Sequence, residues 1–190
     1  MALYYTSDAE FVGVDHRIVP LPMGEYEQCV FRQCVFASAN FGDYCFVDCQ
    51  FNQCDLSLVH LGRTAFKNVQ FKDCKLLGVH FDVCNTFLLD LQFEGCMLNL
   101  SSFHKLKLKN TRFSKCALQE VDFAETNLTG ATFDGCDLNR AVFDRTTLDA
   151  ADFRLASNYI IDPEKNSLRK AHFSQDGLVD LLQRYDIRVG

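Results

Sequence analysis

Phe or Leu recurs at every fifth position of this chain over most of its length. The series begins at Phe31, runs without exception to Phe81, resumes two residues out of register at Leu88 and continues to Phe153. A second residue, usually small, stands two positions before each of them, so the repeating unit is small–x–Phe/Leu–x–x. A period of five matches neither an α-helix, at about 3.6 residues, nor a plain β-strand, at about two.

A chain that turns a corner after every five residues accounts for this spacing. Residues two apart lie on the same side of an extended segment, so the small residue and the Phe or Leu both point inward. Four such sides close one coil, and Cys34, Cys54 and Cys74 recur at the interval that one coil requires. The pattern predicts an all-β solenoid, a quadrilateral β-helix of about eight coils.

The repeat predicts a single domain over residues 1–190, with coils from about residue 7 to 173 and a register slip at 82–87. The slip should bulge at one corner. Beyond the coils, Ser174 is a candidate N-cap for a short helix over about 175–185, which would cover the last coil. The apolar stripe of this helix is wider than a cap requires, so it is also a candidate dimer interface, formed by Leu178, Leu181, Leu182 and Tyr185.

Ten cysteines in a chain without a basic, apolar signal peptide are expected to be reduced thiols. Nine of them occupy the small inward position, where a thiol acts as a small apolar side chain, and only Cys45 points outward. Their spacing does not match the close pairs of a zinc site. We therefore expect no metal and no other cofactor.

The chain has a net charge of −6 and lacks any apolar run long enough to span a membrane. These features predict a cytoplasmic protein that binds neither nucleic acid nor membrane directly. No catalytic motif or constellation occurs, so the protein is not expected to be an enzyme.

Charge is unevenly distributed along the chain. Residues 95–119 contain five lysines or arginines and no acid, whereas residues 120–164 contain ten acids and three arginines. Ordinary solubilising charge is one interpretation. The other is an acidic, partner-facing surface that competes with DNA for a basic protein, with Glu120, Glu125, Asp134, Asp144 and Asp149 as its candidate residues.

The five-residue unit resembles the pentapeptide-repeat family, whose consensus is A(D/N)LXX, and this resemblance implies that the β-helix is right-handed. Beyond the repeat, the chain resembles the Qnr-type quinolone-resistance proteins and the albicidin and microcin immunity proteins. The segments that carry this resemblance are Cys74–Phe81, Phe93–Asn99, Ile161–Pro163, Arg169–Ser174 and Gly177–Val189.

This second resemblance implies a homodimeric, non-enzymatic DNA mimic that binds DNA gyrase or topoisomerase IV and protects it from inhibitors. Quinolone-protective members carry two projecting loops, and this chain has only the short slip at 82–87 and a Pro-containing turn at 17–24. The resemblance therefore favours topoisomerase binding over quinolone protection specifically. The alternative is a structural or protein-interaction β-helix with another partner and no effect on topoisomerases.

Overall fold

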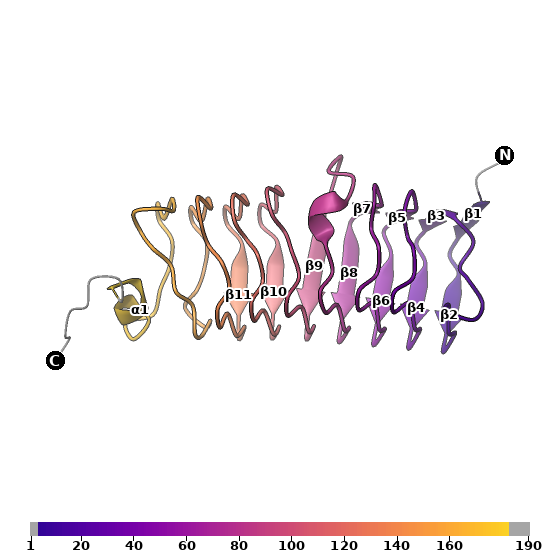
Figure 1. Ribbon diagram of the computed structural model, residues 1–190, viewed down its shortest axis with the longest axis horizontal. Coiled ribbons are helices and arrows are strands. Elements are labelled where there is room, and N and C mark those ends of the chain that lie inside the picture. Colours follow the sequence, from indigo (N-terminus) through magenta and orange to yellow (C-terminus); the bar gives the residue numbers. More distant parts are fainter. Residues whose placement is uncertain (1–3, 183–190) are drawn as a thin grey trace.

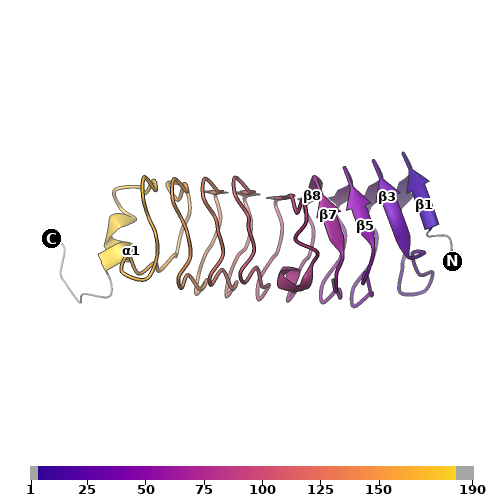
Figure 2. The same ribbon diagram turned by 90° about the horizontal axis from the view of Figure 1, so that it is seen from above.

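The computed structural model describes residues 4–182, which wind into a rod of stacked coils. Short strands from successive coils lie side by side along the rod, and the single short α-helix of the described residues lies at its C-terminal end (Figures 1 and 2). The all-β solenoid expected from the repeat is confirmed. No helix in the described part of the chain is long and apolar enough to cross a lipid bilayer.

Two parallel sheets occupy two of the four sides of the rod. The four-strand side contains β1 (Tyr4–Ser7), β3 (Gly24–Glu27), β5 (Cys45–Val47) and β7 (Ala65–Lys67). The seven-strand side contains β2 (Glu10–Val12), β4 (Val30–Arg32), β6 (Gln50–Asn52), β8 (Val69–Lys72), β9 (Leu91–Glu94), β10 (Arg112–Ser114) and β11 (Thr132–Asp134).

Isolated parallel bridges hold the other two sides together. One series joins Asp15, Val35, Asp55 and Lys75, and another joins His80, Ser102, Asp122 and Val142. Each bridge joins residues one coil apart, so the hydrogen bonds run along the rod on every side. Side chains at equivalent positions of successive coils consequently form columns, separated by the roughly 4.8 Å spacing of paired strands.

The core consists of these columns of inward-pointing rings and aliphatic groups. The longest is a stack of nine phenyl rings with centroids 4.6–5.4 Å apart and planes within 15° of parallel: Phe11, Phe31, Phe51, Phe71, Phe93, Phe113, Phe133, Phe153 and Phe173. Rings on adjacent sides meet edge to face, as Phe113 and Phe123 do at 78°. Both arrangements are favourable for aromatic quadrupoles.

The small inward position has a hydrogen-bonding role as well as a packing role. Thr64 Oγ1 donates to the carbonyl of Phe41 at 2.7 Å, and Cys49 Sγ donates to that of Tyr26 at 3.2 Å. Each acceptor carbonyl belongs to the preceding coil, to the large residue in the middle of a five-residue unit, which is called the central residue below. Ser, Thr and Cys fit this position because they are small and also supply a donor to a carbonyl buried at the corner.

Corners of the rod contain residues in the left-handed region of φ. These residues stand two positions after the central Phe or Leu, as Ser38 (φ 59°), Asp43 (φ 66°) and Ala150 (φ 57°) do. The amide after the corner closes the turn, as in the 2.8 Å bond from Ala39 N to Phe36 O. This is the backbone of a type II turn, which recurs at the corners where the closing bond forms, as from Val59 N to Leu56 O at 3.2 Å and from Ala151 N to Leu148 O at 3.0 Å.

The two extra residues of the register slip lie later in the chain than the sequence pattern predicts. Ala65 bridges to Asn85 at the ordinary coil interval, whereas Val69 pairs with Leu91, two residues further on. The insertion therefore falls between Asn85 and Leu91, so it overlaps the expected interval of 82–87 only at residues 86 and 87. Residues 82 and 83 of the expected interval belong to a 3₁₀ turn, η1 (Phe81–Val83), which lies before the register shifts.

Leu88 was expected to point into the core, and this expectation is wrong. Its φ is 56° and its side chain is 64% exposed, because the insertion places it at an outward-pointing corner. The next residue, Leu89, packs against the core instead. Phe87 is 69% exposed, so the insertion presents two adjacent large apolar side chains to solvent.

The C-terminal helix of the described residues is α1 (Leu178–Leu182), and residues 183–185 of the expected helix lie outside the described residues. Ser174 Oγ accepts a bond from Gly177 N at 3.1 Å, which is consistent with its expected capping role. A Cβ at Gly177 would lie 1.9 Å from Tyr159 Oη, so any other residue here would have to displace the buried tyrosine ring. Leu181 packs against the core together with Leu168 and Phe173.

Candidate interaction surface

The described residues contain no group of three His, Cys, Asp or Glu side chains placed to hold a metal ion. All the cysteines are free thiols, nine of them buried and Cys45 half-buried. Burial raises the pKa of Cys49 to about 12 and also raises that of Cys84, so these thiols stay protonated at neutral pH. None of the five candidate acids is buried, so they lie on the outer surface of the rod.

Two of the candidate acids lie together around one arginine. Arg145 contacts Glu125 at 3.2 Å and Asp144 at 3.1 Å, and Lys105 approaches Glu125 from the preceding coil at 3.8 Å. These charges are mostly exposed, so each pair contributes at most about 1 kcal/mol. The cluster is accessible to a partner, but its acids are partly neutralised within the rod.

The other three candidate acids occupy different sides of the rod. Glu120 faces Arg140 at 3.8 Å on a corner. Asp134 belongs to β11 on the seven-strand side and lines a small hollow with Asp152 and Arg154. Asp149 accepts bonds from Ser167 Oγ at 2.6 Å and from Arg169 N at 3.0 Å. The acids thus surround the C-terminal half of the rod and do not form one continuous face.

Hydrogen bonds favour the ionised form of one candidate acid and of a neighbouring carboxylate. The bond from Ser167, with support from Arg169, lowers the pKa of Asp149. Bonds from Asn158 and Gln119 lower the pKa of Asp137, another carboxylate of the same half. Because a lower pKa favours the charged form, the negative charge of this half is maintained at neutral and mildly acidic pH.

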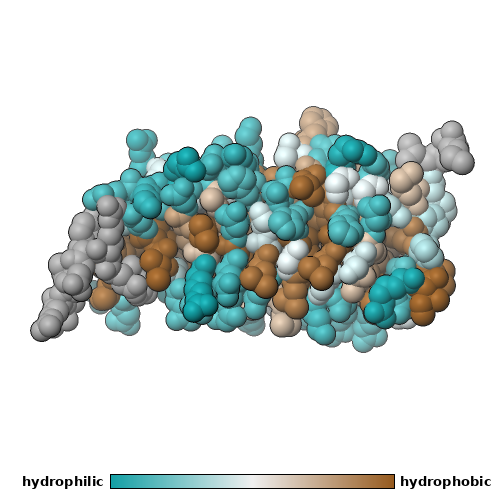
Figure 3. Space-filling model, viewed as in Figure 1, coloured by the Kyte–Doolittle hydropathy of each residue, from teal (hydrophilic) through white to brown (hydrophobic). Residues whose placement is uncertain are grey.

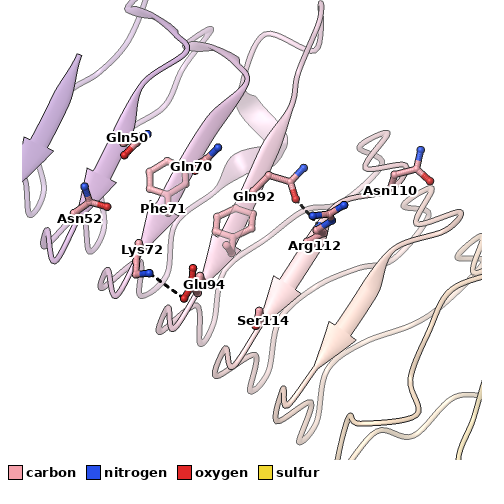
Figure 4. Close-up of a pocket in the computed structure, with 11 residues that line it drawn as sticks. Gln50, Asn52, Gln70, Phe71, Lys72, Gln92, Glu94, Asn110, Arg112 and Ser114 are labelled. Carbon is pink, nitrogen blue, oxygen red and sulfur yellow. Dashed lines mark hydrogen bonds and ion pairs between the residues drawn. The ribbon is translucent and has the colours of Figure 1, made fainter. Parts of the chain in front are cut away.

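A polar groove of about 620 Å³ crosses the seven-strand side (Figure 4). Gln50, Gln70 and Gln92 form a column of amides along it, and Gln92 Oε1 accepts a bond from Arg112 N at 2.8 Å. Lys72 Nζ contacts Glu94 at 3.1 Å across two neighbouring strands. This groove was not predicted, although the recurrence of Gln one position before Phe51, Phe71 and Phe93 was a signal for it.

The insertion between Asn85 and Leu91 forms a second surface that was not predicted from the sequence. Leu88 lines a hollow of about 540 Å³ together with Lys107 and Lys109 of the next coil. In Figure 3, apolar patches interrupt an otherwise mostly hydrophilic face of the rod. The signal in the sequence was the run Phe87-Leu88-Leu89, which supplies more large apolar residues than one corner can bury.

The candidate dimer residues are only partly covered by the rod. Leu178 is 49% exposed, and Leu181 and Leu182 are half-buried. Tyr185 lies outside the described residues. Helix α1 therefore both contacts the last coil and presents apolar surface outward, and its role as a dimer interface stays a prediction.

Solved structures of other proteins have a similar fold. A structure of a trypsin-treated variant of QnrB1, a plasmid-mediated fluoroquinolone resistance protein, is similar with a TM-score of 0.71 and 15% identity. It covers 98% of this chain and 92% of its own. A second trypsin-treated variant of QnrB1 aligns with a TM-score of 0.57 and 15% identity, over 98% of this chain and 100% of its own.

No curated protein matches the sequence of this chain. The family model described as "Pentapeptide repeat region" matches residues 44–122 and 79–153, which together make up more than half of the chain. The stacked coils, the corner turns and this match lead to one assignment: the chain belongs to the pentapeptide-repeat family.

Proposed function

We propose that this protein is a non-enzymatic binding protein that occupies the DNA-binding surface of a type II topoisomerase, DNA gyrase or topoisomerase IV, and protects the enzyme from inhibitors. The observation that carries the proposal is the acidic C-terminal half of a rigid rod. Residues 120–164 contain ten acids against three arginines, and the acids surround the rod as phosphates surround a duplex.

The dimensions of the rod support this proposal. Nine stacked phenyl rings at about 4.8 Å per coil span about 40 Å, which is close to one turn of duplex DNA at about 34–36 Å. The backbone that carries each charged side chain is hydrogen-bonded to the coils around it, so the positions from which the charges project are fixed. A backbone that is already ordered loses little conformational entropy on binding.

The likeness in fold to QnrB1 is further support. QnrB1 is a fluoroquinolone resistance protein, and its trypsin-treated form shares the solenoid over nearly the whole chain. The proposal includes protection of a topoisomerase from an inhibitor by this protein. It also includes a location in the cytoplasm, where the protein would encounter a bacterial topoisomerase.

Dimerisation belongs to the same proposal. Two rods joined through Leu178, Leu181 and Leu182, with Tyr185, would form a symmetric assembly about 80 Å long by the same coil spacing. Light scattering on the full chain at tens of micromolar should give a dimer, and Leu182→Asp should give a folded monomer. A monomeric wild-type protein would end this part of the proposal.

A gyrase supercoiling assay tests the main proposal. Added protein should inhibit supercoiling at high concentration and, at lower concentration, restore activity in the presence of an inhibitor. The variant Glu120→Lys with Asp134→Lys should weaken both effects at least tenfold, because it replaces two exposed acids with cations.

Glu10→Lys is the matched control, since Glu10 is an exposed, arginine-paired acid like Glu120 but lies in the N-terminal half. It should leave both effects unchanged. If excess protein neither inhibits gyrase nor counters any inhibitor, the protein is instead an interaction module with another partner.

A further inference from the structure

The insertion after Asn85 holds an apolar pair in a defined position. Phe87 N donates to Asn85 Oδ1 at 2.9 Å, which fixes the turn that projects Phe87 and Leu88. The two side chains are 69% and 64% exposed. Exposed large apolar residues on a rigid turn are typical of contact surfaces and not of a solubilising face.

Cations surround this pair on the same side of the rod. Lys107 and Lys109 line the hollow beside Leu88, and Lys67 stands one coil before Phe87 in the same column. Arg112 lies just around the corner, in the groove that shares Asn110 and Gln92 with this hollow. The one carboxylate that lines the hollow is Asp90, whose Oδ1 accepts a bond from Gln92 at 3.2 Å.

These cations differ from most others on the rod in having no acidic partner. Arg63 pairs with Asp43 at 2.6 Å, Lys72 with Glu94 at 3.1 Å and Arg145 with Glu125 at 3.2 Å. Within residues 4–182, by contrast, Lys67, Lys107, Lys109 and Arg112 form no ion pair. Unneutralised charge beside exposed apolar surface is available to a ligand of opposite charge.

We propose that Phe87, Leu88, Lys107 and Lys109 form a docking surface for a short acidic segment of a partner protein. An apolar side chain of that segment would pack on Phe87 and Leu88, and its carboxylates would face the two lysines. This surface goes beyond the proposed function, because a surface that replaces DNA must be acidic, whereas this one attracts acids.

Charge decides between a protein segment and the other polyanions. The protein carries a net charge of −6, and acids surround its C-terminal half. These acids repel other anions over about 8–10 Å at moderate salt. A DNA duplex or an anionic membrane is large enough to come within that range when it contacts the lysines. An acidic segment of a few residues is small enough to contact only the lysines, so it avoids this repulsion.

Fluorescence anisotropy tests the proposal with the full-length protein and a peptide of sequence EDLFEDLE that carries an uncharged dye. The peptide should bind saturably at low salt and more weakly as salt rises. Lys107→Glu with Lys109→Glu should weaken binding at least tenfold, and Phe87→Ser at least threefold. Lys170→Glu, which changes an exposed lysine elsewhere on the rod, should leave binding unchanged.

Thermal melting of each variant shows whether it is folded, and none of these side chains is buried. Absence of saturable binding overturns the proposal, as does binding that the insertion variants leave intact. Tighter binding of a 20-base-pair duplex or of phosphatidylserine vesicles at the same surface also overturns it. The supercoiling assay does not depend on these outcomes, so this proposal and the topoisomerase proposal can fail separately.

Discussion

Phe123 stacks on Phe103 of the preceding coil with ring centroids 5.4 Å apart and planes 8° from parallel. Phe143 stacks on its other face, also at 5.4 Å, so the ring of Phe123 is enclosed on both sides. Its side chain is fully buried. Every interior layer of the rod is held in this way, so each layer supports two neighbours and the loss of one ring affects three coils.

Phe123→Ala should therefore lower stability by about 3–5 kcal/mol, because the cavity cannot close without moving the coils on either side. Asp144→Ala, which removes only a surface ion pair with Arg145, should cost at most about 1 kcal/mol. Thermal or urea unfolding measures both. Equal losses from the two substitutions would contradict the inward assignment of Phe123.

Adjacent alanines offer a test of the corner conformation. Ala150 is exposed with a φ of 57°, which is strained for any residue with a Cβ, so Ala150→Gly should raise stability by about 1 kcal/mol. Ala151 is fully buried and is not in the left-handed region, so Ala151→Gly should lower stability by a similar or larger amount. Melting temperatures of the two variants should shift in opposite directions. A loss of stability in both would show that the corners are not strained.

His16 should make stability depend on pH. It occupies the position of a central Phe, stacks on Phe36 at 4.6 Å, and its Nδ1 lies 2.9 Å from Val19 O. Desolvation lowers its pKa below the usual 6.5, although the Val19 carbonyl and Asp15 oppose this shift. The unfolded chain then binds a proton more readily than the folded one, so the contribution of neutral His16 is complete above pH 6.5 and is lost as pH falls below it.

Urea unfolding between pH 5 and 7.5 checks this prediction. The His16→Phe variant should show a smaller loss of stability below pH 6.5 than wild type. His172→Gln, which changes an exposed histidine, should retain the wild-type slope. The same slope in all three proteins would rule out His16 as the cause.

Thiol reactivity should separate one cysteine from the other nine. Cys45 is half-buried, and the rest are buried with less than a tenth of their surface exposed. A maleimide reagent in native buffer should label Cys45 first, slowly because burial raises its pKa, and Cys45→Ser should remove this phase. Mass spectrometry that finds Cys96, Cys116 or Cys136 modified at the same rate would show that this column is open to solvent.

Much of the fold followed from local pattern. The inward direction of Phe123, of Thr64 and of the cysteine columns is set by residue spacing along an extended chain with regular corners. Burial of a large apolar residue every five positions favours one way of closing that chain, so the solenoid and its columns were predictable. The hydrogen-bonding role of the small inward residues was not predicted, because the acceptor carbonyl lies in another coil.

The candidate site was predicted less well. The sequence identified the acids of residues 120–164 but not that Arg145 gathers Glu125 and Asp144 while Glu120, Asp134 and Asp149 lie on other sides. The partner of an outward side chain is usually about 20 residues away, in the neighbouring coil, and long flexible side chains choose among several partners there. Sequence spacing along one coil carries no information about that choice.

The insertion after Asn85 shows most clearly which features the sequence determines and which depend on the tertiary structure. By itself, the sequence determined that the register shifts by two residues between Phe81 and Phe93, because the period of five resumes out of phase. Only the tertiary structure decided that Leu89 enters the core and that Phe87 and Leu88 face solvent. All three are apolar, so hydrophobicity alone cannot rank them; the hydrogen bonds to the coils on either side, such as Asp90 N to Phe66 O at 3.1 Å, determine where the chain can turn inward again.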